Sequence, residues 1–221
     1  MFSKIRIANR GEIACRVIPS ALRILLTAGA IATVSAEAST HSIKNLSIIS
    51  LKMGDNFVPH FAVDGRPARI IQAWRGNGNA HGYTIFLVAM PGGESQTDWN
   101  VVSIDEPHGP ARDEILDSPY NGEQYLHSIR FAHGSLDGKP ETLLLSARLN
   151  IKRSYGERAS VTYDVYKLVH DDESFGTWDR FVLVERSQSA KRYCNAELAI
   201  SRRFAIPLGD YGGPNKKDGC P

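Results

Sequence analysis

The sequence predicts a mostly β fold, an antiparallel meander or sandwich-like sheet with one C-terminal helix. After residue 38, short apolar runs alternate with clusters of turn-forming residues, which is typical of an all-β domain. Several of these runs also repeat with a period of two, as a strand does. One late segment instead has its apolar residues at helical spacing. A chain of 221 residues has room for one such domain and an extension.

Eight segments are expected to form strands, since they are rich in β-branched and aromatic residues and lie between turn signals. They are Ile43–Met53, Arg69–Trp74, Tyr83–Met90, Trp99–Asp105, Tyr125–Ala132, Glu141–Asn150, Ser160–Val169 and Arg180–Glu185. In the sixth, Leu143, Leu145 and Ala147 alternate with Leu144, Ser146 and Arg148. This period of two predicts a half-buried strand.

The connections predict how the later strands pair. Asp137-Gly138 lies between two of them, and an Asp-Gly pair favours a tight hairpin turn. The last four segments are therefore expected to form an antiparallel meander. Ala190–Phe204 is expected to be the helix, with Pro207 just beyond it as a stop.

Residues 1–38 are expected to be a leader that precedes a single β-rich domain over residues 39–221. Ile24–Ala36 has no charged residue, follows Arg16 and Arg23, and ends in small residues. This order is typical of a secretory signal, and the stretch is shorter than the ~20 apolar residues of a membrane-spanning helix. The alternative is a buried amphipathic helix. The protein is thus expected to be periplasmic or secreted, or cytoplasmic if the leader is not cleaved, with no stable membrane span after processing.

Residues 2–18 read FSKIRIANRGEIACRVI, and this segment resembles the N-terminal opening of biotin carboxylases and the biotin-dependent acyl-CoA carboxylases. The matching residues are Lys4, Ile7, Ala8, Asn9, Arg10, Gly11, Glu12, Ile13, Ala14, Arg16, Val17 and Ile18. In that family the segment forms a strand, a turn and the start of a helix. Pro19 departs from the family, because proline disrupts a continuing helix. The resemblance carries over no functional residue and implies a fused, truncated or mis-started reading frame.

Charge and cysteine content also divide the chain near residue 38. The leader has a net charge of +3, and residues 39–221 carry 21 basic and 22 acidic residues, a net charge of −1. A nearly neutral body gives no electrostatic reason to expect nucleic-acid binding. Cys194 and Cys220 remain as a pair in the body. In an exported domain the simplest interpretation is a disulfide between them; in a cytosolic protein they would be separate thiols.

Asp105, Glu106 and His108 are the weak candidates for a catalytic site. They follow a predicted strand, and a carboxylate beside an imidazole can tune a general base. The neighbouring Pro107 and Gly109 fit an exposed turn equally well.

Other polar and aromatic residues favour plain structural roles. His127 and His133 share a predicted strand, but their spacing of about 20 Å is too wide for one metal site. The run Asp171-Asp172-Glu173 fits a solvated turn, and no cofactor or metal is expected. Trp74, Trp99 and Trp178 fit a core better than a ligand platform.

These observations lean away from an enzyme. The leading hypothesis is an exported β-rich binding or interaction protein whose partner is an unknown protein or envelope component. The first alternative is an exported hydrolase with a site around Asp105–His108. The second is an inactive biotin-carboxylase-like fragment or fusion.

Overall fold

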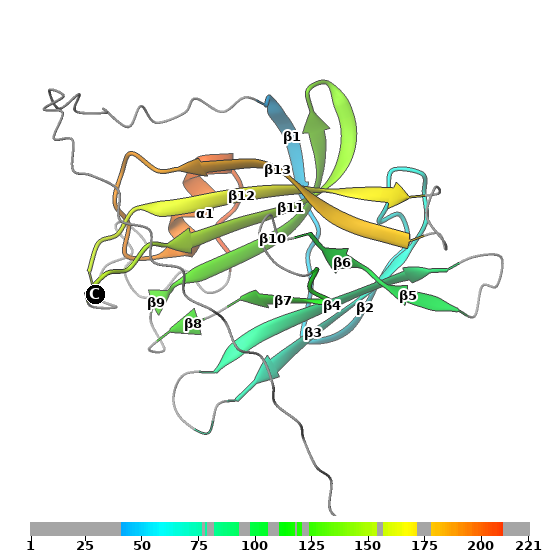
Figure 1. Cartoon of the computed structure of the whole chain (residues 1–221), viewed down its shortest axis with the longest axis horizontal. Coiled ribbons are helices and arrows are strands. Elements are labelled where there is room, and N and C mark those ends of the chain that lie inside the picture. Colours follow the sequence, from blue (N-terminus) through cyan, green and yellow to red (C-terminus); the bar gives the residue numbers. More distant parts are fainter. Residues whose placement is uncertain are drawn as a thin grey trace, which may run out of the picture. The chain divides into compact units, whose positions relative to one another are not determined.

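The computed structural model describes residues 41–76, 78, 82–92, 98–105, 111–117, 119–120, 124–153, 157–171 and 178–209. The predicted leader lies outside these residues, so its interpretation stays a prediction. The described part of the chain is mostly β, as expected, with two sheets and one helix (Figure 1).

Sheet A has six strands in the order β1-β10-β11-β12-β13-β6. Its first five strands pair antiparallel, and the short β6 pairs parallel to β13. Consecutive pairing from β10 to β13 confirms the predicted meander. The strands are β1 (Ile43–Ile48), β6 (Ser103–Ile104), β10 (His127–Leu136), β11 (Lys139–Leu149), β12 (Val161–Asp171) and β13 (Trp178–Gln188).

The β10–β11 hairpin turns at the predicted Asp-Gly pair. Asp137 and Gly138 both have positive φ, 54° and 84°, which is the backbone that a tight hairpin requires. The Asp137 carboxylate also accepts a hydrogen bond from the backbone N–H of Ser42 at 2.8 Å. The turn therefore holds the start of β1 as well as joining two strands.

Sheet B is smaller and faces sheet A. Its path is β2-β3-β4-β5, and β7 also pairs with β4. Its strands are β2 (Gly54–Val58), β3 (Ala68–Arg75), β4 (Tyr83–Pro91), β5 (Trp99–Val101) and β7 (Glu114–Asp117). The remaining elements are the β8 (Pro119–Tyr120) and β9 (Gln124–Tyr125) pair and the helix α1 (Ala196–Phe204).

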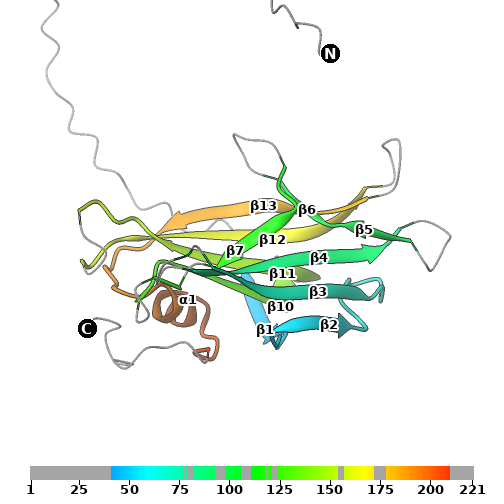
Figure 2. The same cartoon turned by 90° about the horizontal axis from the view of Figure 1, so that it is seen from below.

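Two separate cores cover the two faces of sheet A. Phe131 and Leu144 point toward sheet B, and join Ile70 and Phe86 of that sheet in one core. Their sequence neighbours point to the opposite face, where α1 packs. That second core contains Ala132, Leu143, Leu145, Val161, Tyr163, Ala199 and Ile200. Figure 2 shows β2, β3 and β4 beside the long strands of sheet A.

This layering corrects the predicted half-buried strand. Residues 142–147 of β11 are all buried, because sheet B covers one face of the strand and α1 the other. A strand between two layers shows a nearly continuous apolar run. The consecutive residues Leu143, Leu144 and Leu145 form an apolar run of this kind.

Three predicted element boundaries are also wrong. Trp99–Asp105 is not one strand, because its residues divide between β5 of sheet B and β6 of sheet A. Ile43–Met53 is not one strand, because the chain leaves sheet A after Ile48 and enters sheet B at Gly54. The helix begins at Ala196 and not at Ala190, because the Asn195 side chain accepts hydrogen bonds from the N–H groups of Glu197 and Leu198. Capping of this kind satisfies N–H groups that have no partner within the helix.

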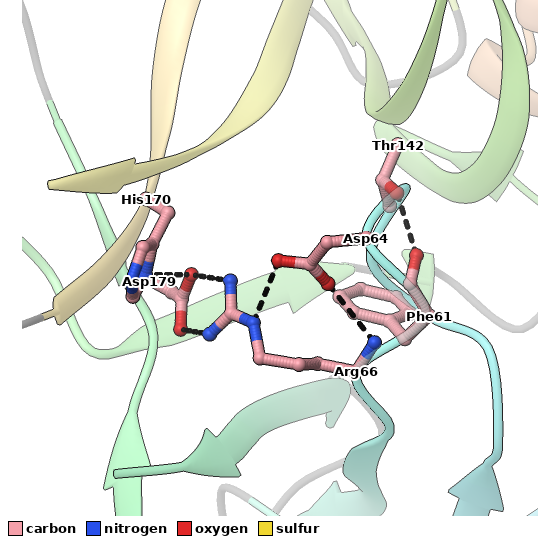
Figure 3. A network of polar contacts seen from close by, with 6 residues as sticks. All are labelled: Phe61, Asp64, Arg66, Thr142, His170 and Asp179. Carbon is pink, nitrogen blue, oxygen red and sulfur yellow. Dashed lines mark hydrogen bonds and ion pairs between the residues drawn. The ribbon is translucent and has the colours of Figure 1, made fainter. Parts of the chain in front are cut away.

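The loop between β2 and β3 joins the two sheets (Figure 3). The Phe61 side chain is completely buried between them, with its ring centroid 6.2 Å from that of Phe131 and 6.3 Å from that of Phe181. The Phe61 carbonyl oxygen accepts hydrogen bonds from Thr142 Oγ1 at 2.5 Å and from His133 Nε2 at 2.9 Å. One residue of this loop thus fills the core and bonds to sheet A.

Arg66 fixes the other end of this loop. Its guanidinium donates two hydrogen bonds to the buried Asp179 carboxylate of β13, at 2.6 and 2.8 Å, and a third to Asp64 at 2.7 Å. His170 Nδ1 lies 3.0 Å from the same Asp179 carboxylate. Figure 3 shows these side chains converging from the loop and from sheet A. Two-point contact between a guanidinium and a carboxylate fixes orientation as well as distance.

We expect Phe61→Ala to lower the free energy of unfolding by about 3–5 kcal/mol, because it leaves a cavity at the centre of the inter-sheet core. Val63→Ala is the matched control in the same loop, since Val63 is 56% exposed; its effect should stay within about 0.5 kcal/mol. Urea denaturation measures both. Equal effects of the two substitutions would contradict the role given to Phe61.

Candidate functional site

A cavity of about 300 Å³ lies between the two sheets. Its walls come from the end of β1, from β10, from the inner face of sheet B, and from the segment that follows α1. The lining residues are Ile48, Ile49, Ser50, Leu51, Gln72, Thr84, Phe86, Asp117, Tyr125, Ile129, Arg130, Phe131, Pro207, Leu208 and Gly209. A volume of this size is at the lower end of the range for small-molecule sites.

Asp117 is the unusual residue of this lining. It is the last residue of β7, lies directly opposite Thr84 of β4, and is only 6% exposed. The Oδ1 atom is buried and has no hydrogen-bond partner among the described residues. Burial, with a smaller contribution from the nearby Glu197, raises the pKa of Asp117 to about 8 against the opposing charge of Arg130. The Asp117 carboxyl is therefore mainly protonated and uncharged at neutral pH.

Arg130 does not ionise Asp117 because its charge is already paired. Its Nη2 group donates to Glu197 Oε1, and its Nη1 group donates to the carbonyl oxygen of Ile129 at 2.7 Å. Glu197 is 1% exposed, and its other carboxylate oxygen accepts from the Ser128 hydroxyl. Glu197 lies in the first turn of α1, where the helix dipole also favours a negative charge.

Glu197 also holds the segment that closes one side of the cavity. The backbone N–H of Gly209 donates to Glu197 Oε1 at 2.7 Å. A Cβ atom at position 209 would lie 2.7 Å from that same oxygen and would collide with Arg130 Nη2. Glycine is thus required for the backbone to approach the ion pair so closely. The helix, β10 and the segment 207–209 meet at this one carboxylate.

The remaining lining combines polar and apolar groups. Gln72 and Thr84 are nearly buried on the inner face of sheet B, beside the apolar side chains of Phe86, Ile129 and Phe131. Pockets of this composition bind small molecules, with the polar groups setting orientation and the apolar walls supplying contact area.

The predicted catalytic residues do not form a described site. Asp105 is half-buried and its carboxylate receives a hydrogen bond from Arg180 at 3.2 Å. Glu106 and His108 lie outside the described residues. Asp105 does not line any of the three cavities found among the described residues. The proposal of a hydrolase at Asp105, Glu106 and His108 therefore stays a prediction.

The two histidines of β10 each have a bonding partner. His127 Nε2 lies 2.9 Å from Ser146 Oγ, and His133 donates to Phe61. Burial, together with the positive charges of Arg148 and Arg112, lowers the pKa of His127 to about 3. These three residues line a second cavity with Leu116, Leu126, Leu149 and Ile151. In the described part of the chain, no group of three or more His, Cys, Asp or Glu is placed to hold a metal ion.

The aromatic predictions have mixed outcomes. Tyr163 and Tyr166 are buried in the two cores. Trp74 is 53% exposed, so a core position is wrong for it. Trp99 is half-buried, and the Arg69 guanidinium lies 5.4 Å from its ring centroid. The Trp178 side chain lies outside the described residues.

Cys194 is buried just before α1 and is disulfide-bonded. Cys220 lies outside the described residues, so the pairing of Cys194 with Cys220 stays a prediction. None of the helices in the described ranges has the length and apolar character needed to cross a bilayer.

The outer face of sheet B carries exposed apolar side chains beside the Arg69–Asp55 ion pair. Phe57, Ile71 and Val101 are between 43% and 57% exposed and lie on the side away from sheet A. Ile71 pairs with Leu87, and Val101 pairs with Ala89, so the apolar side chains run across neighbouring strands. Exposed apolar patches of this kind are typical of interaction surfaces.

Sequence reasoning missed the residues of the inter-sheet cavity. Asp117 lies in a four-residue strand that the sequence pattern did not indicate, and Arg130 has no motif around it. Glu197 carried a usable signal, because an Asn before an apolar helix indicates a helix start with acidic residues in its first turn. Nothing in the sequence indicated that Glu197 pairs with Arg130.

Comparison with known proteins adds one likeness in fold. No family model matches the chain, and no curated protein matches it. Its fold is similar to that in the crystal structure of CarG. The alignment has a TM-score of 0.54 and 13% identity, and covers 69% of this chain and 92% of CarG. At this identity CarG informs the fold alone. It gives no support for the resemblance of residues 2–18 to biotin carboxylases.

We expect Glu197→Ala to lower the free energy of unfolding by about 3 kcal/mol, because it leaves Arg130 without its charge partner. Glu141→Ala is the matched control, since Glu141 makes a looser pair with Lys167 at 4.0 Å; its cost should stay below about 1 kcal/mol. Chemical denaturation compares the two variants. A cost for Glu197→Ala no larger than that of the control would show that the pair is not important for stability.

Proposed function

We propose that this chain is an exported binding protein that takes a small molecule into the cavity between sheets A and B. One observation carries the proposal: the buried Asp117 carboxyl lines the cavity with an oxygen that has no hydrogen-bond partner in the part of the chain that the structure describes. A buried polar atom without a partner costs stability. A ligand that bonds to it recovers that cost on binding.

The cavity chemistry favours binding over catalysis. Asp117 is held uncharged, and the Arg130 charge is engaged by Glu197. A hydrolase instead needs a nucleophile beside a group that can remove its proton. The hydrolase alternative would have to use the Asp105–His108 region, where Arg180 bonds to the Asp105 carboxylate and also pairs with Asp171 at 3.4 Å.

Export is part of the proposal and rests on the sequence. The uncharged stretch Ile24–Ala36 follows basic residues and ends in small ones, as a secretory signal does. A periplasmic or secreted location follows if this segment is cleaved. If it is retained, the same domain would act in the cytoplasm.

A protein partner or envelope component is the second candidate ligand. The exposed Phe57, Ile71 and Val101 on the outer face of sheet B favour it. This face lies on the opposite side of sheet B from the cavity, so the two candidates can be tested separately. Net charge gives no support for a nucleic-acid partner, because residues 39–221 are nearly neutral.

The proposed function is tested by screening small fragments of varied charge by ligand-observed NMR against the protein and two variants. Thr84→Phe fills the cavity beside Asp117, whereas Thr162→Phe places the same ring on β12, away from the cavity lining. We expect fragments to bind the unmodified protein and Thr162→Phe, and to lose at least about tenfold in affinity for Thr84→Phe.

Fragments that bind equally to both variants would refute the cavity as the binding site. The outer face of sheet B would then be the remaining candidate. Circular dichroism of each variant verifies that it is folded.

A further inference from the structure

The charges around the inter-sheet cavity restrict which ligand it can take. The ionisable lining residues are Asp117, Arg130 and Tyr125, with Glu197 directly behind Arg130. Arg130 and Glu197 cancel each other, and Asp117 is uncharged at neutral pH. The empty site is therefore close to electroneutral. An anionic ligand would be buried without an available counter-charge, and a cationic ligand would gain one only if Asp117 lost its proton; both are costly.

An anionic ligand is disfavoured on a further ground. The Arg130 guanidinium is bonded on one side by Glu197 and on another by the Ile129 carbonyl oxygen. A ligand carboxylate that approached Arg130 would come close to the Glu197 carboxylate. Like charges repel each other, and the low dielectric constant between the sheets strengthens the repulsion at such short distances.

Protonated Asp117 offers a hydrogen-bond donor and an acceptor side by side. The group that matches both is an uncharged carboxamide, whose carbonyl oxygen accepts and whose N–H donates. Thr84, directly across the strand pair from Asp117, adds a hydroxyl that can serve either role. Gln72 of the adjacent strand β3 adds a side-chain amide, which can both donate and accept.

The walls around these groups suit a compact apolar body. Ile48, Leu51, Phe86, Ile129 and Phe131 line the rest of the cavity. Phe86 and Phe131 are in edge-on contact, with ring centroids 5.8 Å apart, so they present a firm aromatic wall. A flat or short aliphatic group fits a cavity of about 300 Å³.

We propose that the cavity binds an uncharged molecule that joins a carboxamide to a compact apolar body, with the carboxamide bonded to the Asp117 carboxyl and the body against Phe86 and Phe131. This proposal deepens the proposed function and rests on it. It names the ligand class that the same cavity selects.

Three probes of similar size and different charge test this ligand class: benzamide, benzoate and benzylammonium. Their affinities for the full chain are measured at pH 6 by protein-observed NMR, which also reports where each probe binds. We expect benzamide to bind at least about tenfold more tightly than either charged probe. Benzamide affinity should then fall as the pH rises through about 8, because ionised Asp117 no longer donates.

Two variants separate hydrogen bonding from shape. Asp117→Leu keeps the branching and the number of side-chain heavy atoms and removes both bonds, so benzamide should lose about tenfold in affinity. Asp117→Asn keeps a donor and an acceptor, so it should retain benzamide binding within about threefold and remove its pH dependence. The Asn variant also guards against misfolding, since it preserves the shape of the side chain.

Tighter binding of benzylammonium than of benzamide would overturn the carboxamide class, because it would mean that the site ionises Asp117 to bind a cation. Failure of all three probes would also overturn this class. In either case the proposed function would stand if the Thr84→Phe substitution still abolished the binding of other fragments. If every fragment still bound to the Thr84→Phe variant, the proposed function itself would be refuted.

Discussion

The ion pair between Glu197 and Arg130 is the interaction on which the candidate site depends. It joins the first turn of α1 to β10, and the Gly209 backbone bonds to the same carboxylate. It also occupies the positive charge nearest to Asp117. Because Arg130 is neutralised in this way, burial dominates at Asp117 and keeps that carboxyl uncharged. One buried pair thus positions the helix, closes the cavity and determines its charge.

The fold provides the setting for this pair by covering sheet A on both faces. Sheet B packs on one face through Phe61 and its aromatic neighbours, and α1 packs on the other through Ala199 and Ile200. The cavity lies where β1, β10 and the inner face of sheet B meet the segment after the helix. Its polar groups therefore come from segments far apart in the chain, and those of sheet B, Gln72 and Thr84, point away from the exposed outer face of that sheet.

The sequence predicted local features well because their causes are local. The Asp137-Gly138 turn, the four-strand meander and a late helix followed from residue types within short windows. The burial of β11 on both faces, seen at Leu143, Leu144 and Leu145, was missed, because period-two alternation does not show that a second layer covers the other face. The cavity was missed for a stronger reason. Asp117, Arg130 and Glu197 come together only through tertiary packing, and no spacing in one sequence records that contact.

We infer that burial keeps the Asp117 carboxyl uncharged at neutral pH, while the opposing charge of Arg130 is paired with Glu197. The most direct test is a carbon-13 NMR titration of the Asp117 side-chain carboxyl, assigned by comparison with Asp117→Asn. We expect a pKa of about 8, far above the ordinary 3.8. The protonated Asp117 carboxyl then contributes to the free energy of unfolding at low pH, and this contribution is lost as the pH rises from about 4 to 8. An Asp117 carboxyl that titrates near 4 would contradict this inference.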